Sequence, residues 1–486
     1  MTHMRAGGSG DDDPNLALRL WFELAVQRER LAMLEQQLSR MKSSRSWRIT
    51  APLRAAFRRL SGTAQLARPG GLARCGHSHG VKPSLVLPFG AVAALLEGAD
   101  AKKRLFIDVT ELALEDLGAG VQRVTRRLLS ELLLAPPAGY HVQPVRLHAD
   151  SGYCAANEFL ASFLGLDRLH LGTDVPVEPR RGDCFVGLDF CRDRADELAP
   201  ALEALRQGGA SIALLVHDVL PLSRPDWFPE WVSANYESWL RVLSSQADLA
   251  MCISAHTAGE LARALSERSL PAPPAGLSVV TLGSDIPPLP ENCTELPRRQ
   301  SGVCRVLTVG TIEPRKGHAQ ALDAFEAIWS KGGDIEWMII GRPGWHVDRL
   351  LQRLREHPEA GKRLHWLDAA DDAVLSAAYR ASDVLLAPSL GEGFGLPVAE
   401  AGRLGLKLVL RDLAVFREVA GGAAVYFSGE TPQAIVQALT DAQSHRGSSR
   451  GEWNSWADAA VKLASCATAG QPPAGDRPFD GHGREV

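Results

Sequence analysis

Short apolar runs alternate with longer, more polar stretches between residues 104 and 430. Most of these runs end at glycine, proline or a polar residue, which is typical of buried strands in a parallel sheet. The predicted strands are 104–109, 142–147, 184–188, 212–216, 305–310, 335–341, 364–367, 384–387, 406–410 and 424–427. Apparent helices lie between several of them, for example at 121–134 and 375–381. Strands that alternate with helices predict an α/β fold with parallel sheets.

The chain is too long for one hydrophobic core, at 486 residues, and a proline-rich stretch separates two groups of strands. The strand pattern on each side of it predicts a Rossmann-like domain. The predicted organisation is a helical extension at 1–62, a linker at 63–100, a first Rossmann-like domain at 101–290, a linker at 291–302, a second Rossmann-like domain at 303–467 and a disordered tail at 468–486.

The extension contains two segments that indicate interaction surfaces. Residues 16–41 carry leucines at alternating spacings of three and four, which fits self-association through a short coiled coil and equally a helix packed on its own chain. Residues 42–60 interleave six basic residues with Trp47 and aliphatic residues, without an acidic residue among them. This mixture favours attachment to an anionic membrane surface, with a solvated helix face as the alternative.

Composition narrows the class of protein. A net charge of −4 is too small to predict nucleic-acid binding, and there is no apolar run long enough for a transmembrane helix. The polar N-terminus predicts no signal peptide. The eight cysteines are scattered without a Cys-x-x-Cys pair, so we expect reduced cysteines and no metal site. The expected location is cytoplasmic, peripheral on the inner face of the plasma membrane.

The strongest indication of a binding site lies between Pro388 and Pro397. Pro388 ends a short strand because it has no N–H to donate, and Pro397 suits the first turn of a helix. Between them Gly391, Gly393 and Gly395 permit close approach of the backbone to a ligand. Free N–H groups and the positive end of a helix dipole then meet at one point, which attracts phosphate.

Two carboxylates, Glu392 and Glu400, flank this predicted phosphate site, so the ligand should also be rich in hydroxyl groups. The segment that they bound resembles the E-x7-E motif of retaining glycosyltransferases of the GT-B fold, known as family 4 or group 1. The resemblance implies that Glu400 binds the ribose of a sugar nucleotide. It also implies that Glu392 acts beside the donor sugar, with the N–H groups of Gly393, Phe394 and Gly395 nearby. An ordinary turn between strand and helix is the alternative.

Two adjacent cations, Arg315 and Lys316, follow the strand at 305–310 and suit a diphosphate leaving group. Lys316 matches the lysine of the same family, whereas Thr311 stands where the family usually has an arginine. The Glu-Pro-Arg-Lys sequence resembles a variant of bacterial mannosyltransferases, which leaves open whether Arg315 replaces the usual arginine. By the same resemblance, the turn at Gly341 lies beside the nucleotide.

The first domain contributes a glycine loop and a histidine. Gly120 precedes the helix at 121–134, but Arg123 stands where a dinucleotide fingerprint needs its third glycine. The resemblance implies that this loop faces the cleft between the domains, on the acceptor side, where Gln122 and Arg123 contact the donor phosphates or the acceptor. It also places His217 near the donor sugar as a catalytic or sugar-binding residue; a ring held by local backbone is the alternative.

Five aromatic residues cluster shortly after this histidine. They are Trp227, Phe228, Trp231, Tyr236 and Trp239. Such rings either stack on an acceptor sugar or pack in the core of a domain, and packing is the more common role.

The resemblance covers roughly residues 104–465 and implies a retaining hexosyltransferase. It also implies two further strands in the first domain, at 248–254 and 279–285. Its partners would be a nucleotide sugar, with mannose favoured, and a glycan or lipid-linked acceptor in bacterial surface polysaccharide or lipopolysaccharide synthesis. No metal or other cofactor is expected. A nucleotide-sugar epimerase and a non-catalytic scaffold of a polysaccharide assembly complex are the alternatives. The presence of Glu392, Glu400, Lys316 and His217 argues against the scaffold.

Overall fold

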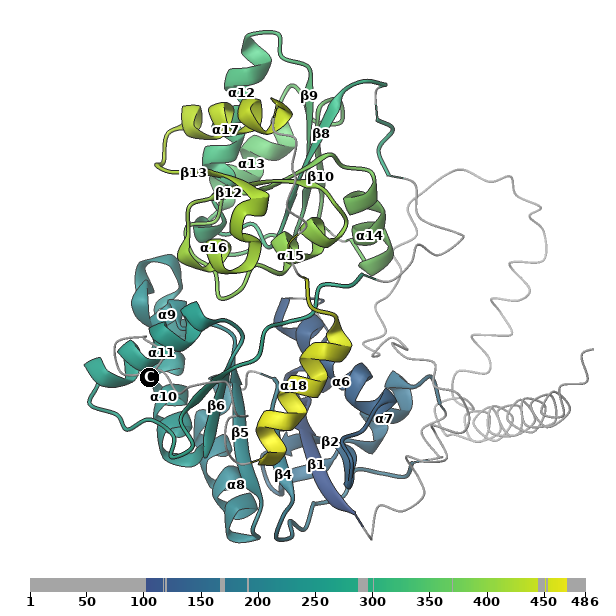
Figure 1. The fold of residues 1–486 in the computed structure, drawn as a ribbon, viewed down its shortest axis with the longest axis vertical. Coiled ribbons are helices and arrows are strands. Elements are labelled where there is room, and N and C mark those ends of the chain that lie inside the picture. The colour runs from purple at the N-terminus through teal and green to yellow at the C-terminus, as the bar shows by residue number, and fades with distance from the viewer. Residues whose placement is uncertain are drawn as a thin grey trace, which may run out of the picture. The chain divides into compact units, whose positions relative to one another are not determined.

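The computed structural model describes residues 102–469, except 117, 119, 167–170, 190–191, 287–295, 300, 369, 445–450 and 452. These residues form two β-sheets, each covered by helices (Figure 1). The predicted α/β class, with two Rossmann-like domains, is confirmed. No helix in the described part of the chain has the length and hydropathy needed to cross a membrane. The predicted coiled coil, basic segment and first linker, and the tail from residue 470, lie outside the described residues.

The first sheet has seven strands in the order β3-β2-β1-β4-β5-β6-β7. The strands are β1 (Lys103–Asp108), β2 (Tyr140–His148), β3 (Gly152–Ala155), β4 (Cys184–Gly187), β5 (Ser211–Val216), β6 (Leu249–Cys252) and β7 (Leu277–Val279). All pair in parallel except β3, an antiparallel edge strand that the sequence did not predict. β7 ends where a longer strand was predicted to begin, because the chain beyond it turns away and Ser284 N donates to Asn454 O.

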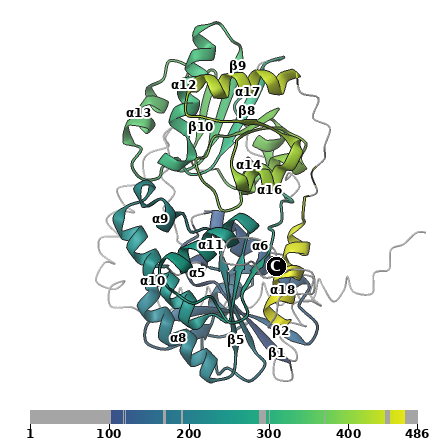
Figure 2. The same cartoon turned by 60° about the vertical axis from the view of Figure 1, so that its left-hand side comes forward.

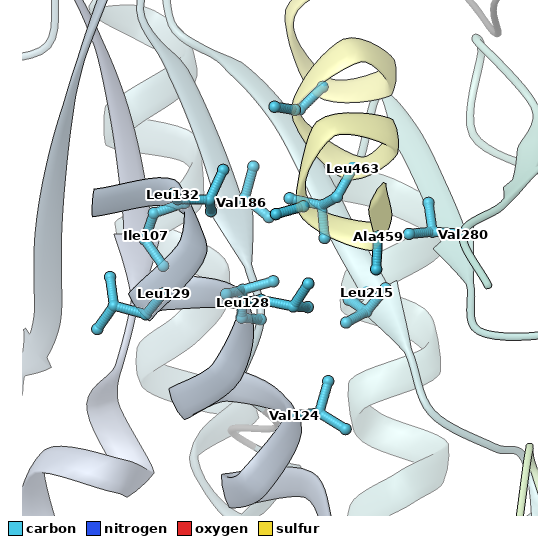
Figure 3. Packing of buried hydrophobic residues seen from close by; sticks show 14 of the residues in the cluster. Ile107, Val124, Leu128, Leu129, Leu132, Val186, Leu215, Val280, Ala459 and Leu463 are labelled. Carbon is cyan, nitrogen blue, oxygen red and sulfur yellow. The ribbon is translucent and has the colours of Figure 1, made fainter. Parts of the chain in front are cut away.

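Helices cover both faces of this sheet. They are α5 (Thr110–Leu114), α6 (Gly120–Leu134), α7 (Asn157–Phe163), α8 (Ala195–Gln207), α9 (Leu220–Ser223), α10 (Glu230–Gln246) and α11 (Ala255–Glu267). α6 is amphipathic, and its buried residues Val124, Leu128 and Leu132 lie over the strands (Figure 3). α11 begins at a strong N-cap, because the side chain of Ser254 accepts a hydrogen bond from Thr257 N.

The last described helix, α18 (Trp456–Ala469), packs beside α6 on this first sheet, where Leu463 joins the same core (Figure 3). The sequence had placed these residues in the second domain. α18 returns because its apolar face, which includes the fully buried Trp456, needs a core to cover. The contact is close: Asp285 accepts a hydrogen bond from Trp456 N at 2.6 Å. A side chain at Gly283 would collide with the same backbone, since its Cβ would lie 2.4 Å from that nitrogen.

The second sheet has six parallel strands in the order β10-β9-β8-β11-β12-β13. The strands are β8 (Cys304–Val309), β9 (Ile335–Ile340), β10 (Leu364–Leu367), β11 (Val384–Ala387), β12 (Lys407–Arg411) and β13 (Ala424–Phe427). β9 and β10 follow β8 toward one edge of the sheet, and β12 and β13 follow β11 toward the other edge. The carboxyl ends of β8 and β11 therefore form a topological switch point, where open parallel sheets bind their ligands.

Six helices cover the second sheet. They are α12 (His318–Ser330), α13 (Asp348–Glu356), α14 (Asp372–Arg380), α15 (Leu396–Arg403), α16 (Ala414–Ala420) and α17 (Pro432–Ser444). α12, α13 and α17 share one hydrophobic cluster, and α12 and α17 lie side by side in both views (Figures 1 and 2). α14, α15 and α16 share a second hydrophobic cluster. α12 and α15 both begin at the switch point, each directly after the loop that follows β8 or β11.

Candidate functional site

The turn between β11 and α15 has the backbone that its glycines predict. Gly395 is the N-cap of α15 in the left-handed conformation, with φ of 91°. Gly393 is required for a different reason from the one predicted. A Cβ at Gly393 would lie 1.9 Å from His217 O, so the turn packs against the carboxyl end of β5. Hydroxyl groups of Ser254 and Thr257 donate to Gly393 O at 2.6 Å and 3.0 Å. The sequence had not linked these two residues to the site.

Glu392 is the centre of a dense charged network. Its Oε1 lies 2.6 Å from Nζ of Lys316 and accepts a hydrogen bond from the Ser389 hydroxyl at 2.7 Å. Its Oε2 lies 3.2 Å from Nη1 of Arg315. Burial alone would raise the pKa of Glu392, but the charges and hydrogen bonds of these neighbours outweigh it and lower the pKa to about 2. Glu392 is therefore a permanent carboxylate at neutral pH.

Arg315 turns its guanidinium toward the protein. Besides Glu392, it contacts Oε1 of Glu313 at 2.8 Å through Nη2 and donates to Gly391 O at 3.1 Å through Nη1. Its own carbonyl accepts from Leu390 N at 2.6 Å. Arg315 thus joins the loop after β8 to the loop after β11. Burial alone would lower its pKa, but Glu392 and Glu313 raise it, so the guanidinium stays charged.

A small pocket lies between these two loops. Its polar lining comes from Thr308, Lys316, His318, Ser389 and Glu392. Gly395 and the start of α15 form another part of its wall. The structure therefore brings together Lys316, Glu392 and Gly395, as the sequence predicted. Phe394 is buried in the core cluster of the first domain instead.

Glu400 lies apart from this pocket. Its side chain is 1% exposed and does not belong to the pocket lining. Oε1 accepts a hydrogen bond from Nη2 of Arg123 at 2.5 Å, and Oε2 accepts one from the hydroxyl of Tyr379 at 2.7 Å. Burial and the charge of Glu400 raise the pKa of Tyr379 well above its ordinary value, so the phenol remains a donor. Lys316 and Glu400 thus do not line the same pocket. Nothing in the sequence identified Tyr379 as a partner.

His217 lies at the carboxyl end of β5, against the turn. It is buried, and its Nε2 lies 3.0 Å from Leu188 O. Because a carbonyl only accepts, Nε2 carries the proton in this arrangement. Burial lowers the pKa of His217 more than Leu188 and Asp218 raise it, which favours the neutral ring. The ring is held by local backbone, which was the alternative interpretation, and it is the backbone carbonyl of His217 that packs against Gly393.

Two further predicted residues lie outside the pocket lining. Gly120 begins α6 in open space, where a Cβ would have no atom within 4 Å of it. At Gly341 a Cβ would lie 1.8 Å from Gly310 O, so its small size serves the packing of the loops after β8 and β9.

The aromatic cluster is mainly a packing feature. Trp227, Tyr236 and Trp239 are buried, and the indole of Trp345 donates to Trp227 O at 2.8 Å. Trp231, by contrast, is 53% exposed. Packing is therefore the role of most of these rings. Among the described residues, no group of His, Cys, Asp and Glu is arranged to hold a metal ion.

Comparison with known proteins shows one matching family and several relatives. Residues 304–445 match the family described as Glycosyl transferases group 1. The chain is 36% identical over 377 residues to the serotype-specific mannosyltransferase WbdA of Escherichia coli, covering 74% of this chain and 46% of that protein. It is 28% identical over 236 residues to the O-antigen chain mannosyltransferase B of Escherichia coli, covering 46% of this chain and 60% of that one. The chain thus spans about half the length of the WbdA relative.

Two solved structures are similar to this chain at low sequence identity. A sucrose-phosphate synthase from Thermosynechococcus elongatus is 17% identical, with a TM-score of 0.48, over 76% of this chain and 94% of that one. HepE of Anabaena, solved in complex with UDP and glucose, is 16% identical, with a TM-score of 0.48, over 75% of this chain and 95% of that one.

Proposed function

Because residues 304–445 form a domain of the group 1 glycosyl transferases, we propose that this chain is a retaining glycosyltransferase. It moves a hexose from a nucleotide sugar to a glycan or lipid-linked acceptor. The two relatives described above are mannosyltransferases, one of them of the O-antigen chain, which supports mannose as the sugar and a bacterial surface polysaccharide as the product. The observation that carries the proposal is the pocket at the switch point of the second sheet, where Lys316, Glu392 and Gly395 meet.

The charge of this pocket suits the diphosphate of such a donor. Lys316 and the positive end of the α15 dipole would hold the phosphate oxygens and stabilise the charge that develops as the sugar leaves. Arg315, which already binds Glu392 and Gly391, would keep the two loops in register. Because these groups supply positive charge, the proposed reaction requires no metal.

Glu392 would act by orientation and not by proton transfer. A carboxylate whose pKa is about 2 is a weak base, and its oxygens are already held by Lys316, Arg315 and Ser389. In the proposed step the acceptor oxygen bonds to the anomeric carbon, the bond from that carbon to the diphosphate breaks, and the leaving phosphate takes the acceptor proton. Glu392 keeps the ammonium of Lys316 aimed at that phosphate.

His217 and Glu400 complete the proposed donor site. His217, a neutral ring directly after β5, would orient a hydroxyl of the sugar. Glu400 would bind the ribose, and for this Arg123 must move aside or share the carboxylate, since it now covers Oε1. The ribose assignment therefore needs a change of contacts around Glu400.

Donor binding and turnover test the proposal. The full chain is incubated with GDP-mannose, UDP-glucose or a dTDP-sugar, and thermal stabilisation and nucleoside diphosphate release are measured with and without a glycan acceptor. One donor should stabilise the chain and release its diphosphate faster with acceptor. Lys316→Ala should lose both effects, whereas Lys331→Ala, an exposed lysine at the end of α12, should keep them. Absence of any effect from every donor would contradict the proposal, and isomerised donor without transfer would indicate an epimerase.

We further propose that the chain binds an anionic membrane surface through residues 42–60 and associates with itself through residues 16–41. The supporting observations are the six basic residues without acid in the first segment and the leucine spacing in the second. A membrane location would bring the pocket close to a lipid-linked acceptor.

A further inference from the structure

His318 is a buried polar side chain without a partner. It is the first residue of α12 and is 1% exposed. Neither Nδ1 nor Nε2 has a hydrogen-bond partner. Buried polar groups in native proteins are almost always hydrogen-bonded, so an imidazole with both nitrogens free indicates a partner that binds from outside the chain.

The free ring lines the pocket described above. His318 shares its wall with Lys316 and Glu392. Its position is set by Gly317, whose Cβ would lie 2.3 Å from Pro388 O, so the start of α12 packs tightly against the end of β11. The helix cannot withdraw the ring from the pocket without breaking this contact.

The charged groups around the ring come from three elements. Lys316 precedes it on the same loop, Glu392 faces it from the turn after β11, and Arg411 of β12 donates to Pro388 O and to Gln320 of α12. Burial and the ammonium of Lys316 lower the pKa of His318 to about 3. The ring is therefore neutral in the unliganded protein at ordinary pH.

The surroundings favour an anion as the missing partner. α12 has 13 residues and begins at the pocket, where the first N–H groups of a helix have no acceptor within it and the positive end of the helix dipole favours an anion. α15 has eight residues and also begins there. The charge of Glu392 is already balanced by Lys316 and Arg315. A phosphate oxygen is a charged acceptor and forms a strong hydrogen bond with an imidazole N–H. We propose that His318 donates a hydrogen bond to a phosphate oxygen of the bound nucleotide sugar, beside Lys316. This inference rests on the proposed function and adds a residue to its donor site.

The contact predicts that binding takes up a proton. A phosphate beside the ring offsets the repulsion from Lys316, so the pKa of His318 is higher in the bound state than in the free state. The affinity that this contact adds is greatest below the free-state pKa of about 3 and falls as pH rises from there to the bound-state pKa. The terminal phosphate of a nucleoside diphosphate titrates near pH 6 itself, so the diagnostic quantity is the difference between variants.

Calorimetry on the full chain tests this inference. GDP, UDP and ADP are compared, and the tightest is titrated in two buffers of different ionisation enthalpy, which measures proton uptake. His318→Phe keeps a ring and removes both nitrogens. Its affinity should fall about tenfold and its proton uptake should disappear. His365→Asn is the matched control, since His365 on β10 is also buried with an unpartnered Nε2 but lies outside the pocket lining. It should bind as the wild type does.

A structural role gives the opposite result. If His318→Phe binds the diphosphate with wild-type affinity and wild-type proton uptake, the inference is overturned. The unliganded thermal stability of this variant should equal or exceed that of the wild type, because an unpaired polar ring is removed. If the phenylalanine variant does not fold, His318→Gln replaces it and should lose proton uptake. A wild-type chain that binds none of the three nucleotides would refute the proposed function itself, which is a different outcome from an unchanged His318→Phe.

Discussion

The Nη2 atom of Arg123 lies 2.5 Å from Oε1 of Glu400. This ion pair joins α6 of the first domain to α15 of the second. The carboxylate is 1% exposed, and Tyr379 occupies its other oxygen. Asp372 lies 3.7 Å from the same guanidinium. Glu400, the residue that the motif assigned to ribose binding, is thus fully engaged within the protein.

This pairing predicts a strong effect of removing Arg123 on stability. Arg123→Leu would leave the charge of Glu400 buried with only Tyr379 as a partner. Breaking one side of a buried ion pair typically costs about 3–5 kcal/mol, so the free energy of unfolding should fall by about 3 kcal/mol. Denaturant unfolding of the full chain measures it. The double variant Arg123→Leu with Glu400→Leu should recover most of the loss, and a single variant as stable as the wild type would show that the pair is unimportant.

Glu400→Gln separates ribose binding from packing. The amide keeps the volume and the contact with Tyr379 but removes the charge. If Glu400 binds ribose, the affinity for the nucleotide sugar should fall about tenfold, as for the loss of a hydrogen bond to a charged group. Calorimetry with the donor checks this. Glu356→Gln, an exposed residue on α13, is the control. Unchanged donor affinity in Glu400→Gln would refute the ribose assignment.

Glu392 predicts an acid-sensitive step in stability. Its pKa falls from 4.5 to about 2 on folding, so the charged carboxylate stabilises the native state above about pH 4.5. This contribution is lost as pH falls from 4.5 to about 2. Thermal unfolding of wild type and Glu392→Gln across this range should converge toward low pH. Because Glu392 stays ionised at higher pH, donor binding should show no transition from this residue between about pH 5 and 8. Parallel stability profiles would contradict the depressed pKa.

A second buried ion pair predicts a purely structural phenotype. Arg305 of β8 and Glu336 of β9 face each other in register, with 2.7 Å between Nη2 and Oε2 and side-chain exposures of 1% and 0%. Arg305→Met should lower the free energy of unfolding by about 3–5 kcal/mol, because Glu336 loses its cation. The double variant Arg305→Met with Glu336→Leu should be much more stable than the single one. Urea unfolding followed by fluorescence measures both, and an unperturbed single variant would contradict the prediction.

The basic segment predicts salt-sensitive membrane binding. The full chain should sediment with vesicles containing an anionic phospholipid and release at high salt, because its six basic residues bind anionic lipid through screened charges. Deletion of residues 42–60 should abolish this binding, whereas deletion of the same number of residues within 468–486 should not. Neutral vesicles serve as the lipid control. Equal binding by both deletions would contradict the assignment to this segment.

Local patterns in the sequence were sufficient for most of the fold. Apolar runs ended by glycine, proline or polar residues located the strands of the second sheet, because strand formation and termination depend on neighbouring residues. The meeting of Lys316 with Glu392 was also predictable, since they follow β8 and β11, which are adjacent in the sheet. β3 was missed because its four residues, Gly152–Ala155, include no Val, Ile or Leu, unlike the other four-residue strands.

The remaining features needed the tertiary structure, because each joins residues far apart in sequence. The return of α18 to the first sheet depends on a core that only the folded chain provides. The pairing of Arg123 with Glu400 spans 277 residues, and no local spacing encodes it. The unpartnered ring of His318 also became visible only in three dimensions, because a histidine at a helix start is ordinary in sequence. Residue types and spacing determined which elements form and which loops carry charge, whereas packing decided which of those charges remain free for a ligand.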